Sequence, residues 1–179
     1  MHKALQNPDI VSTCRYVLFK TFTTFHKAKE SCEKLIMPVT HTNASIAVIK
    51  TREDNKDITQ LLQLAYGIKQ VGRRFDRRNW VWVGLKKILN NNKFLKKKDR
   101  GAKSFNASQW RWDDGSIPEY VRWLRDMPDQ EYDRKTKKYQ DHVSVNKRGK
   151  WDDTFPYKKM PYACNYCGKY IVLARHVTW

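Results

Sequence analysis

The stretch Trp80-Val-Trp-Val-Gly-Leu85 contains two tryptophans and no charged side chain. Aromatic and β-branched residues favour strands, and a run without polar alternation indicates a strand that is buried on both faces. We therefore predict a buried strand here.

Two helices are predicted on the N-terminal side of this strand, over residues 24–35 and 51–65. Thr24 is a suitable N-cap for the first helix, and Gly67 suits the end of the second. Both helices have an apolar face at helical spacing, formed by Phe25, Ala28, Cys32 and Leu35 in the first and by Ile58, Leu61, Leu62 and Ala65 in the second. Residues 15–22 and 46–49 are predicted strands.

On the C-terminal side, several short strands are separated by a long irregular region, residues 117–141. Residues 110–116, 142–145, 160–164 and 170–173 have strand character, and a further strand starts at Trp151. Helices followed by runs of strands indicate an α+β domain. We expect a flexible lead-in over residues 1–12 and a single domain over residues 13–179.

Composition excludes several classes of protein. The chain has 179 residues, of which 40% are apolar and 13% aromatic. Disordered chains are poor in aromatics, and no apolar run here approaches the ~18–20 residues of a membrane span. The net charge is +18, which predicts an anionic partner. The alternative is a solvated basic surface without a dedicated ligand.

Four cysteines allow two interpretations. Cys14, Cys32, Cys164 and Cys167 either form disulfides of an exported domain, or Cys164-Asn-Tyr-Cys167 is half of a zinc site in a nucleic-acid binder. The zinc interpretation is weak, because His176 follows Cys167 too closely for a Cys2His2 finger.

Five motifs together resemble the C-type lectin-like domain. Trp82-Val-Gly-Leu85 resembles the family's W-I-G-L strand, and Gly149-Lys-Trp-Asp-Asp153 resembles its G-x-W-N-D motif. Gln109–Ser116 contains a W-x-D-G-S turn, Pro161–Cys164 resembles the closing aromatic-x-Cys, and Cys32 stands on the first helix. The resemblance implies a fold with two helices packed on short antiparallel sheets and a long irregular loop region.

The resemblance also implies the disulfides. Cys32–Cys164 would be the framework bond, and Cys14–Cys167 would join the first and last strands. The stretch Thr13-Cys-Arg-Tyr-Val-Leu18, continuing through Thr24, Phe25 and Ala28 to Cys32, is similar to the eosinophil major basic protein branch, which is strongly basic and binds heparin-like polyanions.

Calcium is an optional cofactor in the family, and we expect that this chain requires no cofactor. The triplet that matches the family's calcium motif is Met127-Pro128-Asp129, whose Met127 is a poor ligand for a hard cation. An altered calcium site would use oxygens of Asp129, Glu131, Asp141, Asp152 and Asp153. The alternative is that these acids form ion pairs with Arg134, Lys135, Lys137 and Lys138.

Three basic clusters are the candidate polyanion-binding residues, and all are predicted on loops or strand ends. The first is Arg73, Arg74, Arg77 and Arg78, the second is Lys96, Lys97, Lys98, Arg100 and Lys103, and the third is Lys147, Arg148 and Lys150 with Lys158 and Lys159. Several cations that displace counterions together can bind a sulfated polysaccharide.

We therefore expect a secreted, non-enzymatic protein that binds an acidic polysaccharide or glycoprotein, or another protein. A signal peptide is absent from this sequence and is taken to have been removed. Asn43 and Asn106 begin glycosylation sequons. No histidine, serine or cysteine lies in a nucleophile motif. The alternatives are a calcium-dependent lectin with a divergent site and the zinc-dependent nucleic-acid binder, although nucleic acid is disfavoured.

Overall fold

The predicted buried strand is β3 (Trp80–Lys87), and it lies in the middle of the main sheet. The structure is a computed structural model that describes residues 9–35, 44–67, 79–88 and 105–172, with the backbone alone for residues 9–14 and 167–172. In this part of the chain, the main sheet has seven strands in the order β1-β9-β3-β7-β8, with β2 beside β9 and β4 beside β3. Strands β5 and β6 form a separate hairpin.

The remaining elements of the described residues are two α-helices, a short 3-10 helix and eight further strands. The helices are α1 (Phe25–Glu33), α2 (Arg52–Tyr66) and the 3-10 helix η4 (Ala107–Gln109). The strands are β1 (Asp9–Thr23), β2 (Ser45–Ile46), β4 (Trp110–Arg111), β5 (Tyr132–Asp133), β6 (Lys138–Tyr139), β7 (His142–Asn146), β8 (Trp151–Thr154) and β9 (Met160–Val172). The predicted α+β class is confirmed.

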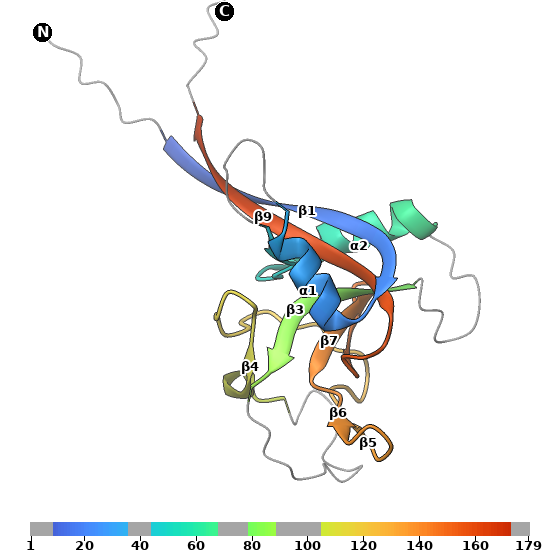
Figure 1. Cartoon of the computed structure of the whole chain (residues 1–179). Coiled ribbons are helices and arrows are strands. Elements are labelled where there is room, and N and C mark those ends of the chain that lie inside the picture. Colours follow the sequence, from blue (N-terminus) through green and yellow to red (C-terminus); the bar gives the residue numbers. More distant parts are fainter. Residues whose placement is uncertain (1–8, 36–43, 68–78, 89–104, 173–179) are drawn as a thin grey trace, which may run out of the picture.

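The first and last strands of the described chain pair with each other. β1 and β9 are antiparallel, and their register runs from Asp9 opposite Val172 to Thr23 opposite Met160. Figure 1 shows that the start of β1 and the end of β9 lie side by side at one end of the molecule. β1 begins at Asp9, so residues 9–12, which we expected in the lead-in, belong to the strand.

A disulfide between Cys32 of α1 and Cys164 of β9 fixes the helix to this pair of strands. The two Cα atoms lie 5.5 Å apart, within the range that a disulfide spans. The framework bond implied by the resemblance is therefore present, and the zinc interpretation is wrong because it needed Cys164 as a ligand. Cys14 and Cys167 are direct register partners in the β1–β9 ladder, where the backbone spacing suits a second bond. That bond stays a prediction.

Both helices lie where they were predicted, and the end signals of α2 are the stronger ones. Thr51 and Asp54 form a reciprocal capping box at the start of α2, and Gly67 ends the helix with φ of +77°. Thr24 is the N-cap residue of α1, as expected, although its side chain makes no capping hydrogen bond. The predicted strand over residues 46–49 is regular only over Ser45–Ile46. Ala47 still bonds through its backbone to Ala163 and Gly84, and Ala47, Val48 and Ile49 are buried.

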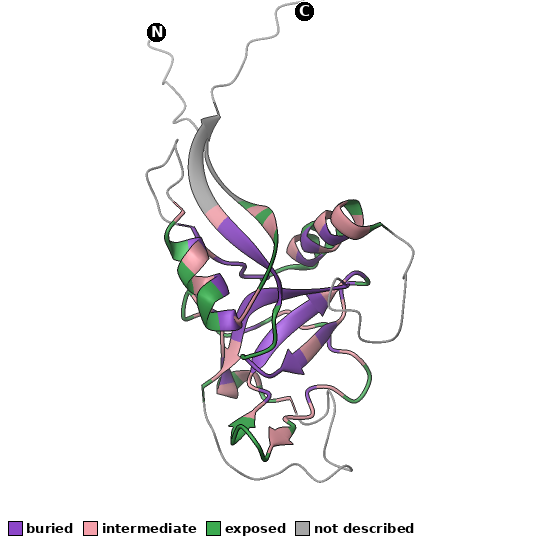
Figure 2. Cartoon of the chain, turned by 45° about the vertical axis from the view of Figure 1, so that its right-hand side comes forward, coloured by how far each residue is buried: buried purple, intermediate pink, exposed green. Residues whose placement is uncertain are grey.

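The core contains every described tryptophan. Trp82, Trp110, Trp112 and Trp151 are almost fully buried, and Trp80 and Trp123 are 8% and 7% exposed. Figure 2 shows buried strands in the centre, with the exposed residues of the helices turned outward. Trp123 lies 5.4 Å from Trp110 and 6.0 Å from Trp151 between ring centroids, so the tryptophans connect the irregular region to the sheet.

Asn55 of α2 connects the helix to the Gly149–Trp151 segment. Its Nδ2 donates to the carbonyl of Gly149 at 3.1 Å, and its Oδ1 accepts from Trp151 Nε1 at 2.7 Å. Gly149 has φ of +69°, and a Cβ there would approach Asn55 Nδ2 to 2.5 Å. Only glycine fits this position without strain or displacement. The side chain of Asn55 is buried, so both hydrogen bonds are protected from water.

We expect Asn55→Ala to destabilise the fold by about 2–4 kcal/mol, because it leaves a buried indole N–H and a buried carbonyl without partners. Chemical denaturation followed by tryptophan fluorescence would measure the change. The matched control is Lys56→Ala on the exposed side of the same helix, for which we expect a change within about 0.5 kcal/mol. Equal stability of Asn55→Ala and wild type would contradict this role.

Candidate functional site

The acidic residues that were expected to hold calcium are linked mainly to one another and to the backbone. Both carboxylate oxygens of Asp153, which is 1% exposed, accept backbone N–H groups, from Asp129 at 3.0 Å and from Gln130 at 2.6 Å. Asp129 Oδ1 in turn accepts the N–H of Glu131 at 3.2 Å. The carboxylate of Asp153 therefore fixes the loop that carries Asp129 and Glu131.

The other two expected ligands differ in their surroundings. Asp141 Oδ1 lies 2.6 Å from His142 Nδ1, so it is already paired. Asp152 Oδ1 is buried and has no hydrogen-bond partner among the described residues. Burial raises the pKa of Asp152, and the nearby carboxylates of Asp129 and Glu131 raise it further.

Burial is the main cause of the raised pKa of both aspartates in the Asp152–Asp153 pair. Desolvation, with the nearby Asp129, raises the pKa of Asp152 to about 7 and that of Asp153 to about 8. A carboxyl group whose pKa is raised in the folded state prefers its proton there. Below about pH 7, the Asp152–Asp153 pair therefore carries less negative charge than two solvent-exposed aspartates would.

A lysine of the protein supplies positive charge to this region. Lys87 Nζ donates to Gln130 Oε1, and its ammonium group interacts with the carboxylates of Asp153 and Asp141. Desolvation lowers the pKa of Lys87 despite these two acids. Lys87 stands at the end of β3, where its backbone N–H also donates to the carbonyl of Asp141 at 2.8 Å.

The acidic set does not fit a calcium ion well. Within the described residues, no group of three or more His, Cys, Asp or Glu side chains is placed to hold a metal. Calcium requires six to eight converging oxygens, whereas Asp153 and Asp141 already have partners and Lys87 brings a competing charge. We derive no calcium-bridged contact with a ligand from this geometry.

The alternative interpretation, ion pairing with Arg134, Lys135, Lys137 and Lys138, is not observed either. These four residues are exposed and, within the described part of the chain, form no ion pair with the acidic residues. Asp133 instead accepts from the N–H of Lys135 at 2.8 Å and from Tyr157 Oη at 2.6 Å. The acidic and the basic residues of this region therefore make separate contacts.

The three predicted basic clusters differ in whether the structure describes them and in how exposed their side chains are. The first two clusters, which span Arg73–Arg78 and Lys96–Lys103, lie outside the described residues. In the third, Arg148 is exposed and Lys150 is partly buried. Lys147 is wrong as a surface cation, because it is 6% exposed and its Nζ donates to the carbonyl of Gly67 at 3.1 Å. The turn after β7 packs against the end of α2, and Lys147 points into that contact.

The two sequons also differ. Asn43 lies outside the described residues. Asn106 is exposed, and its Oδ1 accepts from the N–H and the hydroxyl of Ser108 at 3.0 and 2.8 Å. Glycosylation at either site stays a prediction.

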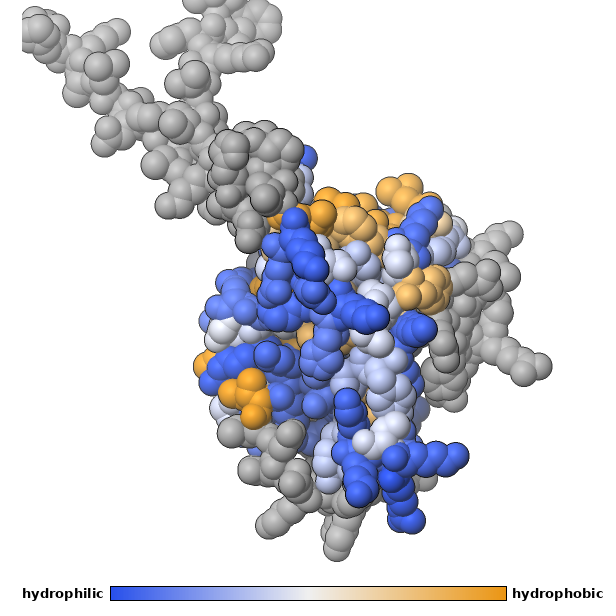
Figure 3. Space-filling model, viewed as in Figure 1, coloured by the Kyte–Doolittle hydropathy of each residue, from blue (hydrophilic) through white to orange (hydrophobic). Residues whose placement is uncertain are grey.

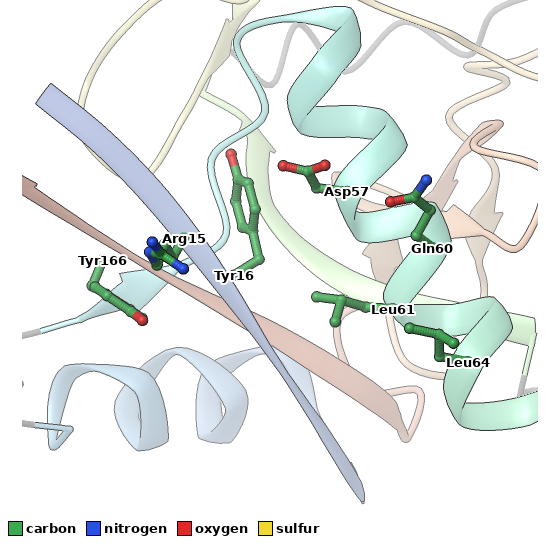
Figure 4. Close-up of a pocket in the computed structure, with 7 residues that line it drawn as sticks. All are labelled: Arg15, Tyr16, Asp57, Gln60, Leu61, Leu64 and Tyr166. Atoms are coloured by element: carbon green, nitrogen blue, oxygen red, sulfur yellow. The ribbon is translucent and has the colours of Figure 1, made fainter. Parts of the chain in front are cut away.

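A hollow that the sequence did not predict lies between β1, β9 and α2. It has a volume of about 500 Å³, and Figure 4 shows its walls. The lining combines aromatic, apolar and charged groups, among them Arg15, Tyr16, Asp57, Leu61, Leu64 and Tyr166. Leu64 is 84% exposed, and Tyr16 Oη donates to the carbonyl of Val48 at 2.8 Å. Sequence periodicity predicted Leu61 on the apolar face of the helix. The hollow itself could not be predicted, because no local sequence signal places β1 beside α2.

Comparison with known structures identifies the fold. Human lithostathine superposes with a TM-score of 0.59 at 15% identity, over 93% of this chain and 92% of that one. The carbohydrate-recognition domain of the human scavenger receptor C-type lectin gives 0.55 at 21% identity, over 86% and 90%. The domain of cow CD23, solved in the presence of a GlcNAc2Man3 oligosaccharide, gives 0.56 at 16% identity, over 87% and 88%. The predicted C-type lectin-like fold is confirmed.

Comparisons by sequence add nothing to this result. No protein-family model matches the chain, and no curated protein is similar to it in sequence. At these low identities the structural likeness shows the fold, and the ligand has to be argued from the residues of this chain.

We expect the stability of the protein to fall as the pH rises from about 4 to about 8. The unfolded state ionises Asp152 and Asp153 near pH 4, whereas the folded state holds their protons up to about pH 7 and 8, so the stabilisation present below pH 4 is lost over this window. Thermal unfolding in EGTA would measure the change.

Asp152→Asn should reduce this pH dependence and raise the stability at pH 8 by about 2 kcal/mol, since an amide has no charge to desolvate. Asp126→Asn is the matched control, because that side chain is exposed. If Asp152→Asn were less stable than wild type at pH 8 in EGTA, the carboxylate would have an unrecognised partner. A calcium-induced rise in melting temperature that is lost in this variant would show that the ion binds at Asp152.

Proposed function

We propose that this chain is an extracellular, non-enzymatic binding protein that recognises acidic polysaccharides of the glycosaminoglycan type through cations on its surface loops. The observation that carries the proposal is the charge balance, 36 basic against 18 acidic residues on a fold whose core is apolar. The excess must lie on the surface, because a buried unpaired cation costs several kcal/mol.

The distribution of the described charges supports this proposal. Lys29, Lys34 and Lys50 form ion pairs, and Lys147 donates a hydrogen bond to the carbonyl of Gly67. Other cations are exposed and form no ion pair in the described ranges, among them Arg134, Lys135, Lys158 and Lys159. Figure 3 shows that one face of the molecule is mostly hydrophilic, with hydrophobic residues gathered near β1 and α2. Unneutralised cations on one surface concentrate an anionic polymer and release its counterions.

Export is supported by the Cys32–Cys164 disulfide, since such bonds persist in oxidising compartments. No helix in the described residues is long and apolar enough to span a membrane. A binding role is supported by the fold that the chain shares with the carbohydrate-recognition domain of cow CD23, which was solved with an oligosaccharide. Here, however, the acidic site is partly occupied by its own hydrogen bonds and by Lys87, which favours recognition by cations over recognition through calcium.

We expect the protein to bind a heparin column and to elute above about 0.5 M salt, because several simultaneous cation contacts weaken steeply and together as salt rises. Elution should be the same in calcium and in EGTA. A basic protein of similar charge and unrelated fold is the control for simple ion exchange, and a carboxymethyl column separates the two effects. Release from heparin below about 0.3 M salt would contradict the proposal.

A further inference from the structure

Two turns that lie far apart in the sequence meet at the β5–β6 hairpin. The hairpin pairs Tyr132 with Tyr139 and Asp133 with Lys138, and its connection carries Arg134, Lys135 and Lys137. The second turn follows β8. There, Tyr157 Oη donates to Asp133 Oδ2 at 2.6 Å, so residues 155–159 lie against the hairpin.

Both turns are held in shape by contacts that leave the lysine and arginine heads free. Asp133 Oδ1 accepts from the N–H of Lys135 at 2.8 Å, and Oδ2 accepts from Thr136 Oγ1 at 2.9 Å. In the second turn, the N–H of Lys158 donates to the carbonyl of Phe155 at 3.0 Å, and the rings of Phe155 and Tyr157 stack at 5.3 Å. The N–H of Phe25 donates to the carbonyl of Pro156 at 3.0 Å and fixes this turn to α1.

The hairpin and turn together present six exposed cations, which we call the hairpin surface. Its members are Arg134, Lys135, Lys137, Lys138, Lys158 and Lys159. In the described residues none of the six forms an ion pair. Lys158 lies over the ring of Phe155 at 5.3 Å, a contact that orients the chain and keeps its charge.

The acidic groups next to the hairpin surface are already bound. Asp133 accepts four hydrogen bonds, and the bond from Tyr157 is the main reason that its pKa falls to about 2. Glu131 is exposed, and its Oε2 accepts from Gln140 Nε2 at 3.2 Å. Asp152 lies near Lys158 and Asp129, and its Oδ1 is buried. The six exposed cations of the hairpin surface still outnumber these four acids, Asp129, Glu131, Asp133 and Asp152, so the local charge is positive.

We propose that the hairpin surface is a calcium-independent binding site for sulfated polysaccharide, with the two turns contacting successive sulfate groups of one chain. This inference rests on the proposed function and names the site that performs it. A polymer fits better than a small anion, because the cations come from two turns and none of them lines a buried pocket. Sulfate groups need only point charges, which lysine supplies.

The test compares two doubly substituted variants of the full chain, K135Q/K158Q on the hairpin surface and R52Q/K56Q on α2. Both pairs are exposed and remove the same charge. Figure 1 shows α2 far from β5 and β6. The probe is a heparin octasaccharide in EGTA, measured by calorimetry at several salt concentrations. Unchanged melting temperatures would show that both variants fold.

We expect K135Q/K158Q to bind about tenfold or more weakly and to lower the salt slope of log K by about two, near 0.9 for each lost contact. R52Q/K56Q should change affinity by less than about threefold. Tyr157→Phe removes the bond between the turns without a change of charge and should weaken binding about threefold. Equal losses in the two double variants, with wild type binding tightly, would overturn the hairpin assignment and leave the proposed function intact.

If wild type failed to bind the octasaccharide, the proposed function itself would fail. Equal competition by a single-stranded RNA of the same charge would overturn the assignment to sulfated polysaccharide. A requirement for calcium would overturn the ion-independent site, because none of its six cations can act as a calcium ligand.

Discussion

The antiparallel pairing of β1 with β9 is the constraint on which the remaining architecture depends. It joins the two ends of the described chain over most of their length, and the Cys32–Cys164 bond ties α1 to the same ladder. Everything between these strands must leave the sheet and return to it. Residues 105–141 therefore extend from the other end of the sheet with little regular structure of their own. Their position depends on Trp110 and Trp123, which pack against each other, and on Trp151, which Asn55 holds from α2.

This arrangement explains why charge collects at the turns. A core built around tryptophans offers cations few partners, and the buried Lys147 donates a hydrogen bond to the carbonyl of Gly67. The acids of the irregular region cap turns and fix loops, as Asp133 and Asp153 do, so they neutralise few lysines. Among the described residues, unpaired cations are therefore left on the outside, and the β5–β6 hairpin of two-residue strands presents four of them, Arg134, Lys135, Lys137 and Lys138.

The sequence predicted those elements whose signals are local. Helix α2 has a capping box at Thr51 and a terminal glycine, and the β3 strand has an uninterrupted apolar run, so both were placed closely. The β5–β6 hairpin was missed, because Tyr132 and Tyr139 alone carry its apolar pairing and five charged residues lie between them. The partner of Asp133 could not be predicted, since Tyr157 lies 24 residues away. Lys147 was misplaced for the same reason, because its contact with Gly67 spans 80 residues.

The Asp152–Asp153 pair and the hairpin surface differ in the free-energy cost of binding a ligand. An ion that entered near Asp152 and Asp153 would meet two buried carboxyls whose raised pKa values favour the protonated form, and it would compete with Lys87 and with two backbone N–H groups. A sulfated chain at the hairpin surface would displace only water and counterions, because the turns are already fixed by Asp133 and Tyr157. An anion at these turns would therefore require no rearrangement of the turn backbone, whereas burial of the acidic pair favours its protonated form. For this chain, the physical advantage lies with the cations, on a fold that in other proteins presents carbohydrate-recognition sites.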